Sequence, residues 1–316
     1  MTSDQRGRLS LVVLTYLRTD DLAELLPLLE QQISTVGHGG CSILVIDNDP
    51  AGSARDVVRR LSSPLVRYVH EPAAGIAHAR NRALAETDDD DLLIFIDDDE
   101  RPLDGWLAAM LDAYARHRPA AVTGPLYPDY ENDPDPWLVA GGFFVRREFP
   151  DGHRVPAAGS GNLLLDLTQV RRLGLRFDER FGLTGGSDTL FTRQLIARGG
   201  VVVFAPRAGV IDKVPATRMT RRWTLRRQYR VGTTWSRTAV ELAQPGPRRL
   251  LTRVQLTAGG GARVGVGAIR HAFGRATGSL THQARGSRTL RRGLGMAAGA
   301  WGGTITEYQR PAGPTA

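Results

Sequence analysis

The chain has 316 residues, of which 41% are hydrophobic, and its formal net charge is +8. This length allows two domains, or one large domain with an appendage, and the composition is that of a soluble globular protein. The single cysteine, Cys41, excludes an internal disulfide framework and fits a reducing cytoplasm. The first residues, MTSDQRGRLSLVV, contain neither the apolar stretch of a signal peptide nor a membrane span, so we expect a cytoplasmic protein.

The net charge is distributed unevenly along the chain. Residues 1–212 hold 22 Arg against 31 acidic residues, a balance of −9, whereas residues 213–316 hold 19 basic residues against 2 acidic ones, a balance of +17. This segregation predicts one domain over residues 1–212 and a separate basic region over residues 213–316. A polyanionic surface, either a membrane or a nucleic acid, would attract the basic region.

Short apolar runs alternate with amphipathic helical patterns through the first two thirds of the chain. In chain order, the pattern predicts strands over 9–16, 42–46, 65–69 and 92–96, each followed by a helix, over 22–33, from 53, over 75–86 and over 105–117. Four such units predict an open, mostly parallel sheet with helices on its faces. Asp21 and Glu24 resemble a capping box for the first helix, in which Pro27 predicts a kink or a late start.

The next part of the chain is less regular. Residues 124–160 are rich in Pro, Gly and Asp and predict a long irregular excursion. A strand is predicted over 161–167, a helix over 187–200 that Gly199 closes, and a strand over 201–206. The basic region then predicts Arg-rich helices that the segments QPGPRR and TAGGGARVGVG interrupt.

Four consecutive acids, Asp97, Asp98, Asp99 and Glu100, directly follow the predicted strand 92–96. Carboxylates this close raise one another's pKa and cost stability, so we expect a positive group to join them. A hard divalent cation, Mg²⁺ or Mn²⁺, is typically held by one or two such carboxylates together with substrate phosphates. The alternative is a solvated turn that leads into the next helix.

A second polar group is expected at the same edge of the sheet. Asp47 and Asp49 follow the strand 42–46, and ligands of open parallel sheets bind beyond the carboxyl ends of the strands. Arg80 and Asn81 lie in the third crossover. A carboxylate here could accept a hydrogen bond from a nucleotide base, and an arginine could meet a base carbonyl or a phosphate. The alternative for Asp47 is an ordinary turn residue.

Seven segments in chain order carry a resemblance to a known family: VVLTYLR, VIDNDP, GIAHARNRAL, FIDDDERPLDGWL, GSGNLLL, FDERFGLTGGSDTLFTRQLIARGG and VVFAPRAGVIDKVP. The set resembles the family 2 glycosyltransferases of the GT-A fold, especially the bacterial members that build exopolysaccharides and other cell-surface glycans. The resemblance covers roughly residues 9–240. It implies an α/β fold with a Rossmann-like, mostly parallel sheet flanked by helices, followed here by an Arg-rich, mainly helical C-terminal extension.

The resemblance also implies roles for individual residues. Asp97 and Asp99 fall in the metal-binding D-x-D motif, and Asp188 matches the acid used as catalytic base. The residues matched to the donor nucleotide are Thr15, Tyr16, Arg18, Asp47, Arg80 and Asp98, with Asp49 added because it shares the strand end of Asp47. The residues assigned to the sugar or the acceptor are Gly161, Asn162, Ser187 and Trp223. The family often has Glu where this chain has Ser187, which predicts a difference in acceptor recognition.

The activity implied is an inverting, metal-dependent transfer of a sugar from a nucleoside-diphosphate donor to a hydroxyl acceptor. A UDP-sugar is the favoured donor, and a lipid-linked or cell-surface glycan is the favoured acceptor. Asp188 would lie in the first turn of the helix 187–200, where the helix dipole favours its ionised, proton-accepting form. The alternatives are a glycosyltransferase that acts on a small-molecule natural product, and a non-catalytic membrane- or carbohydrate-binding protein of the same fold.

The segment 217–237 interleaves arginines with Trp223, Tyr229 and Trp235. Basic amphipathic helices with aromatic residues favour anionic interfaces. We therefore expect peripheral attachment to the inner face of the cell membrane, and no nucleic-acid partner, because no nucleic-acid-binding motif accompanies the arginines. The alternative is that this helix packs beneath the acceptor site.

Overall fold

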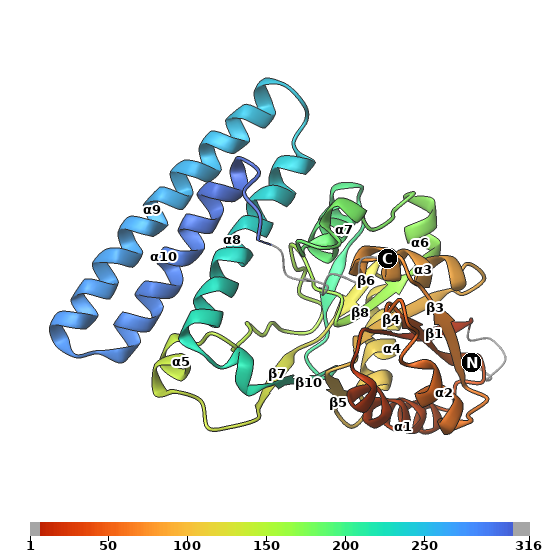
Figure 1. Cartoon of the computed structure of the whole chain (residues 1–316). Coiled ribbons are helices and arrows are strands. Elements are labelled where there is room, and N and C mark those ends of the chain that lie inside the picture. The colour runs from red at the N-terminus through yellow and green to blue at the C-terminus, as the bar shows by residue number, and fades with distance from the viewer. Residues whose placement is uncertain (1–6, 306–316) are drawn as a thin grey trace, which may run out of the picture. The chain divides into compact units, whose positions relative to one another are not determined.

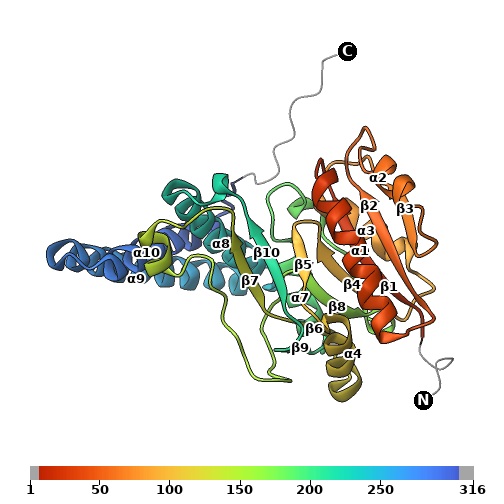
Figure 2. The same cartoon turned by 90° about the horizontal axis from the view of Figure 1, so that it is seen from below.

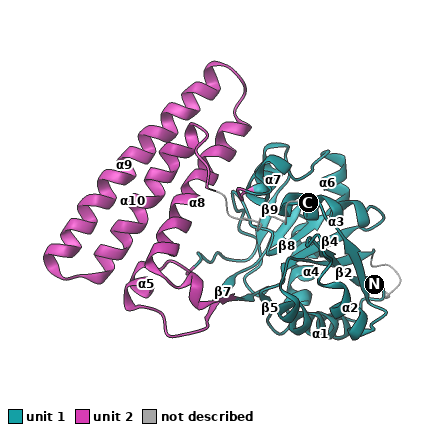
Figure 3. Ribbon diagram, in the orientation of Figure 1, with its two compact units in different colours: residues 1–127, 146–183, 187–212 teal, residues 128–145, 184–186, 213–316 magenta. Residues whose placement is uncertain are grey.

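The computed structural model describes residues 7–305, and Figure 1 labels its helices and strands. Residues 1–6 of the segment MTSDQRGRLSLVV, and Glu307 of the basic region, lie outside the described residues. The chain forms two compact units (Figure 3). Unit 1 contains residues up to 127, 146–183 and 187–212, and unit 2 contains residues 128–145, 184–186 and those from 213 onward. The functional division into a catalytic domain and an acceptor or membrane region remains a prediction.

Unit 1 is built on a seven-stranded sheet whose first four strands are parallel. β1, β2 and β4 lie side by side in both views (Figures 1 and 2). β8 is antiparallel to both of its neighbours, so the mostly parallel sheet predicted from the sequence is confirmed. In spatial order the strands are β3 (Val66–His70), β2 (Cys41–Asp47), β1 (Leu9–Thr15), β4 (Leu92–Asp97), β8 (Asn162–Asp166), β6 (Ala121–Thr123) and β9 (Val202–Phe204).

Helices cover both faces of this sheet. One apolar core lies beneath α1 (Thr19–Val36), α2 (Arg55–Leu61) and α4 (Trp106–His117). The other lies beneath α3 (Ile76–Glu86), α6 (Leu167–Arg172) and α7 (Ser187–Ala197). Consecutive residues of β1 enter opposite cores, Val12 one and Val13 the other, and both are fully buried. Burial on both faces explains why these strands are continuous apolar runs rather than alternating ones.

The strand register aligns polar residues at one edge of the sheet. Thr15 at the end of β1 pairs with Asp47 at the end of β2, and Leu14 pairs with Asp97 at the end of β4. The chain leaves β1 for β2 on one side, and β4 lies on the other side, so this edge is a topological switch point. Open α/β sheets bind ligands at such a point. The structure therefore confirms that Asp47 and Asp97 lie on the same edge.

Two local expectations in unit 1 are wrong. Helix α1 begins at Thr19, so the late start allowed for at Pro27 is wrong, and a kink there remains a prediction. The predicted capping box does not form, because the N-cap residue is Arg18 and Asp21 lies inside the helix. Asp21 and Glu24 accept hydrogen bonds from Arg101.

The segment expected to be irregular is partly ordered. It contains β7 (Leu126–Tyr130) and α5 (Pro136–Gly141), which Asp135 caps by accepting a hydrogen bond from the backbone N–H of Trp137. β7 joins β5 (Glu100–Pro102) and β10 (Val210–Val214) in a second, three-stranded sheet with the order β5-β10-β7. The regular structure of this segment depends on pairing between strands that are distant in sequence. The Pro and Gly content of the segment alone does not reveal such pairing.

Unit 2 is dominated by three helices, α8 (Arg221–Leu242), α9 (Pro247–Thr277) and α10 (Leu280–Ala300). α10 lies between α8 and α9 (Figure 3). The aromatic residues Trp137, Phe143 and Phe144 form a small core with Val214 and Ala284. Within the described part of the chain, every helix is too short or too polar to cross a bilayer.

The glycine-rich segment TAGGGARVGVG does not interrupt a helix, contrary to expectation, but lies inside α9. A Cβ atom on Gly267 would stand 2.5 Å from the backbone nitrogen of Leu290 in α10, and one on Gly260 would stand 2.7 Å from the carbonyl oxygen of Gly293. These glycines therefore let two helix backbones approach closely. The cost of glycine in a helix, about 1 kcal/mol each, is offset by this packing.

We predict that Gly267→Ala destabilises unit 2 by about 1–3 kcal/mol, because the added methyl group would push α9 away from α10. Gly261→Ala on the same helix is the matched control, since a Cβ there meets no atom within 4 Å. The control should stabilise the helix by about 0.5–1 kcal/mol. Urea unfolding followed by far-ultraviolet circular dichroism measures both, and equal effects of the two substitutions would contradict the packing role.

Candidate functional site

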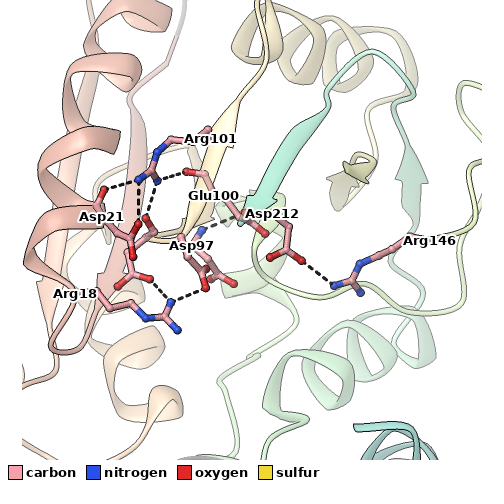
Figure 4. Close-up of polar contacts among 9 residues, drawn as sticks. Arg18, Asp21, Asp97, Glu100, Arg101, Arg146 and Asp212 are labelled. Carbon is pink, nitrogen blue, oxygen red and sulfur yellow. Dashed lines mark hydrogen bonds and ion pairs between the residues drawn. The ribbon is translucent and has the colours of Figure 1, made fainter. Parts of the chain in front are cut away.

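The four consecutive acids lie where β4 ends and β5 begins, and Figure 4 labels the first and the last of them, Asp97 and Glu100. The side chains of Asp98 and Glu100 are buried, whereas Asp97 and Asp99 are partly exposed. The backbone N–H of Asp97 donates a 3.3 Å hydrogen bond to Oε2 of Glu100, which fixes the turn between them. The acidic run is thus a shaped cluster and not a solvated turn.

Arg18 neutralises part of this cluster. The residue follows β1, and its Nη1 lies 2.8 Å from Oδ1 of Asp98 and 2.7 Å from Oδ2 of Asp99. The sequence placed Arg18 and Asp98 together at the donor nucleotide, and the structure brings these side chains into contact. The ion pairs span the ends of two adjacent parallel strands.

The remaining carboxylates carry an electrostatic cost. Burial, and then repulsion from Asp99, raise the pKa of Asp97 above its usual range. Burial, and then repulsion from Asp97 and Asp212, raise the pKa of Glu100 strongly. Burial also raises the pKa of Asp98 to about 6, although Arg18 opposes this shift. Each raised pKa means that the fold penalises the ionised form, mainly through burial and in addition through repulsion between neighbouring carboxylates.

Sequence reasoning missed Asp212 and Arg146 and gave Glu100 no role in the site. Asp212 in β10 is directly paired with Glu100 in β5, and Arg146 lies 3.9 Å from the Asp212 carboxylate (Figure 4). Like charges directly opposite one another in a ladder destabilise a sheet. The available signal was an acid in the otherwise apolar start of the strand VIDKV, but its partner required knowledge of the strand register.

Arg80 lies on the other side of the cluster, next to the predicted catalytic base. Arg80 is 4% exposed, and its guanidinium group donates hydrogen bonds to the hydroxyl groups of Ser187 (2.6 Å) and Ser160 (2.5 Å). Nη2 also lies 4.0 Å from Oδ2 of Asp188. The structure therefore brings Arg80, Ser187 and Asp188 together, whereas the sequence assigned Arg80 to the nucleotide.

Asp188 occupies the first turn of α7, and its side chain remains partly exposed. Oδ1 accepts hydrogen bonds from the backbone N–H (2.6 Å) and the hydroxyl group of Thr189 (3.3 Å). Charge on Asp188 contributes to the raised pKa of Asp97, after larger contributions from burial and from nearer charges. The predicted base therefore belongs to the same electrostatic cluster as the predicted metal ligands.

Gly161 and Asn162 have different surroundings. A Cβ atom on Gly161 would collide with the carboxylates of Glu100 and Asp97, so only glycine allows the chain to pass this close to the cluster. Asn162 is buried and accepts a hydrogen bond from the indole N–H of Trp106 (2.9 Å), while its amide donates to the carbonyl oxygen of Ala208 (2.8 Å). The contacts of Asn162 hold the framework beneath Gly161, and its role toward a sugar remains a prediction.

The predicted base-recognition residues lie one strand further along the edge. Asp47 is fully buried, and Oδ2 accepts hydrogen bonds from the backbone N–H of Ala54 (2.8 Å) and the hydroxyl group of Tyr68 (3.0 Å). Its Oδ1 accepts from the backbone N–H of Asp49 (3.0 Å). These bonds shape the loop after β2, as the turn-residue alternative anticipated, and recognition of a base by Asp47 and Asp49 remains a prediction.

The three remaining residues that were predicted for the site are Thr15, Tyr16 and Trp223. Thr15 is buried at the end of β1, and Tyr16 next to it is half-buried. Trp223 belongs to unit 2, where its ring stacks on Phe144 with centroids 6.2 Å apart. These contacts give Trp223 a packing role within its own unit.

The residues at the end of β4 fit a divalent cation by their chemistry. Carboxylate oxygens are the ligands that Mg²⁺ and Mn²⁺ prefer, and repulsion from Asp99 contributes to the raised pKa values of Asp97 and Asp98 after the larger effect of burial. Within residues 7–305, no three His, Cys, Asp or Glu side chains are grouped so as to hold a metal ion by themselves. A site that takes one or two protein carboxylates and completes its shell with phosphate oxygens and water satisfies both observations.

Comparisons with solved structures agree with this architecture. The mannosyltransferase PcManGT from Pyrobaculum calidifontis, in complex with GDP-Man and Mn²⁺, aligns over 92% of this chain and 87% of its own, with a TM-score of 0.57 and 16% identity. The structure of GalNAc-T7 with UDP, GalNAc and Mn²⁺ aligns over 77% of this chain and 49% of its own, with a TM-score of 0.52 and 14% identity. These likenesses show the GT-A fold.

Comparisons of sequence identify the family. The succinoglycan biosynthesis protein ExoM of Rhizobium meliloti (strain 1021) is 33% identical over 204 residues, which are 64% of this chain and 66% of ExoM. The family model described as glycosyl transferase family 2 matches residues 10–170, a segment that contains the acidic cluster, Arg18, Arg80 and Gly161. The chain therefore belongs to glycosyl transferase family 2.

Proposed function

We propose that the protein is an inverting, metal-dependent glycosyltransferase that moves a sugar from a nucleoside-diphosphate donor to an acceptor hydroxyl group. The observation that carries the proposal is the carboxylate cluster at the end of β4, in which Arg18 contacts Asp98 and Asp99 and Glu100 lies directly opposite Asp212. This cluster lies at the switch point of the sheet, where α/β folds bind nucleotides.

The metal is proposed to be Mg²⁺ or Mn²⁺, held by Asp97 and Asp99. The solved structures of PcManGT and GalNAc-T7 contain Mn²⁺, which supports a divalent ion here. When bound, such an ion would neutralise the charge that develops on the leaving diphosphate. Arg18 already contacts Asp98 and Asp99, so it is placed to orient these carboxylates and to meet a second anion at the same strand end.

Asp188 is the proposed catalytic base. An acceptor hydroxyl is a poor nucleophile and needs a proton acceptor within hydrogen-bond reach. The partly exposed carboxylate of Asp188 retains Oδ2 for this purpose, while Thr189 holds Oδ1 and Arg80 lies 4.0 Å from Oδ2. As Asp188 takes the hydroxyl proton, the acceptor oxygen would bond to the anomeric carbon from the face opposite the leaving diphosphate, and the bond from that carbon to the diphosphate oxygen would break, which inverts the anomeric configuration. Arg80, through Ser187 and Ser160, is proposed to position this helix start.

The donor and acceptor follow from chemistry and from the relatives. A UDP-sugar is the favoured donor, although the neighbours named above contain UDP in one case and GDP-Man in the other. A lipid-linked or cell-surface glycan is the proposed acceptor, in line with the role of ExoM in succinoglycan biosynthesis. Because such acceptors are presented at membranes, we propose peripheral attachment to the inner face of the cell membrane, where the basic unit 2 would meet anionic lipid.

We predict that UDP together with Mn²⁺ raises the melting temperature by about 5–10 °C at concentrations near 100 times the dissociation constant. Asp99→Asn should remove the part of this shift that depends on Mn²⁺. Asp89→Asn is the matched control, because Asp89 belongs to an equally acidic but exposed run before β4, with a side chain that is 90% exposed. A thermal-shift screen of nucleoside diphosphates tests this, and a full Mn²⁺-dependent shift in the Asp99→Asn variant would contradict the metal assignment.

The raised pKa values predict how the stability of the metal-free protein depends on pH. Groups with a raised pKa bind more protons in the folded state, so the free energy of unfolding falls as pH rises from about 4 through the raised value, about 6 for Asp98. Glu100→Gln should therefore raise the melting temperature at about pH 8 and change it little at about pH 4. A lower melting temperature for Glu100→Gln at about pH 8 would contradict the expectation that the ionised Glu100 carboxylate destabilises the folded protein.

Mn²⁺ with UDP should stabilise the wild type more at about pH 8 than at about pH 5, because the metal-bound carboxylates must be ionised. The melting temperature with and without Mn²⁺ and UDP at the two pH values measures this difference.

We predict that Asp188→Asn reduces turnover by about 10²–10⁴-fold without weakening nucleotide binding. The amide cannot accept a proton but keeps the size of the carboxylate and its contacts with Thr189. Release of UDP from the sugar donor measures turnover, and the thermal shift measures binding. Near wild-type turnover in this variant would remove Asp188 from the role of base.

A further inference from the structure

Helix α9 in unit 2 presents a long uncharged face to solvent. Large apolar side chains are exposed along it, among them Val254 (51%), Val266 (61%) and Ile269 (74%). At 100° per residue, the exposed positions on the side opposite α10 fall within one half of the helix surface. Apart from Gln255, and from Arg248 in the first turn of the helix, these positions are apolar: 250, 251, 254, 258, 261, 262, 265, 266, 268, 269, 272, 273 and 276.

The opposite face of α9 is already occupied by α10. The glycines Gly260, Gly267 and Gly274 lie against the α10 backbone, and His271 is within hydrogen-bond distance of Gln283 and Ser287. On the outward face, by contrast, Cβ atoms built on Gly261 and Gly265 meet nothing within 4 Å. The exposed apolar side chains are therefore not needed for packing between these two helices.

The charges that border this face all have one sign. Neither α9 nor α10 contains Asp or Glu. By the same helical spacing, Arg263 and Arg270 lie at one edge of the outward face and Arg275 at the other. An uncharged helix face bordered by cations is the pattern of helices that lie in the interface of anionic membranes.

The helix that sequence analysis assigned to the membrane differs from α9 in this respect. The aromatic side chains of α8, Trp223, Tyr229 and Trp235, are half-buried. Trp223 stacks on Phe144, and Arg227 lies 5.6 Å from the centre of each of these two rings. The apolar groups of α8 thus serve packing within unit 2, whereas those of α9 remain available.

We propose that the outward face of α9 is the membrane-binding surface of the protein and lies in the headgroup region of a bilayer that contains anionic phospholipid. This inference rests on the membrane association included in the proposed function and names the element responsible for it. Val254, Val266, Ile269 and Phe273 enter the boundary between headgroups and acyl chains, and the flanking arginines pair with lipid phosphates.

Charge complementarity favours a bilayer over a second copy of the chain. Two α9 faces brought together would place arginines of one copy near arginines of the other, with no carboxylate on α9 or α10 to compensate them. An anionic lipid surface supplies that compensation and also covers the apolar row. The length of α9, 31 residues or about 46 Å, suits a helix lying along a surface.

Flotation of the full-length protein with vesicles tests the proposal. Vesicles of phosphatidylcholine mixed with phosphatidylglycerol are compared with vesicles of phosphatidylcholine alone. The test variant is Val254→Asp with Val266→Asp. The matched control is Val139→Asp with Val145→Asp, because these valines are equally exposed (59% and 66%) and belong to unit 2 but not to α9. Donor hydrolysis without vesicles reports the proposed enzymatic function separately.

The wild type and the control should float with the anionic vesicles and not with the neutral ones, and the test variant should partition at least about tenfold more weakly. Equal flotation of test and control variants would overturn the proposal. So would a wild type that sediments as a dimer, becomes monomeric in the test variant and binds no vesicles, which would identify a second copy as the occupant. If the wild type does not hydrolyse the sugar donor in the absence of vesicles, this result counts against the proposed enzymatic function and not against membrane binding by α9.

Discussion

Repulsion among the carboxylates at the end of β4 is the interaction on which the chemistry of unit 1 depends. Asp97, Asp98 and Asp99 lie beside Glu100, which in turn is directly opposite Asp212 in the neighbouring strand. Arg18 contacts Asp98 and Asp99, while burial first, and repulsion from the neighbouring carboxylates second, raise the pKa values of Asp97 and Glu100. Burial makes the repulsion stronger than it would be in water. This cluster is the feature on which the proposed cation site rests.

The scaffold holds this cluster where the chemistry needs it. The ends of β1, β2 and β4 are aligned by the parallel register, so Thr15, Asp47 and Asp97 lie along one edge. The first turn of α7 brings Asp188 to the same place, since Arg80 from α3 donates a hydrogen bond to Ser187 beside it. Elements separated by more than a hundred residues thereby form one site. The glycine at 161 completes it, because a larger residue would collide with the acids.

Sequence patterns were sufficient for the alternating strands and helices of residues 9–117 and for the edge at which the site lies, but not for the second sheet, α5 or contacts between distant segments. Continuous apolar runs revealed the buried strands, and the acids after them revealed the site. The partners of Arg80 and the pairing of Glu100 with Asp212 depend on tertiary register, which periodicity does not report. The glycines of α9 were misjudged for a related reason, because close packing against α10 outweighs their low helix propensity.

The central claim is that these carboxylates bind a divalent cation that in turn holds a nucleoside diphosphate. A crystal structure of the protein with Mn²⁺ and UDP, with data collected at the manganese absorption edge, tests it most directly. The account predicts an anomalous difference peak within ligand distance of Asp97 or Asp99 and of the diphosphate oxygens. UDP bound at this edge of the sheet with its diphosphate held by Arg18 alone, and no manganese peak beside the acids, would contradict it.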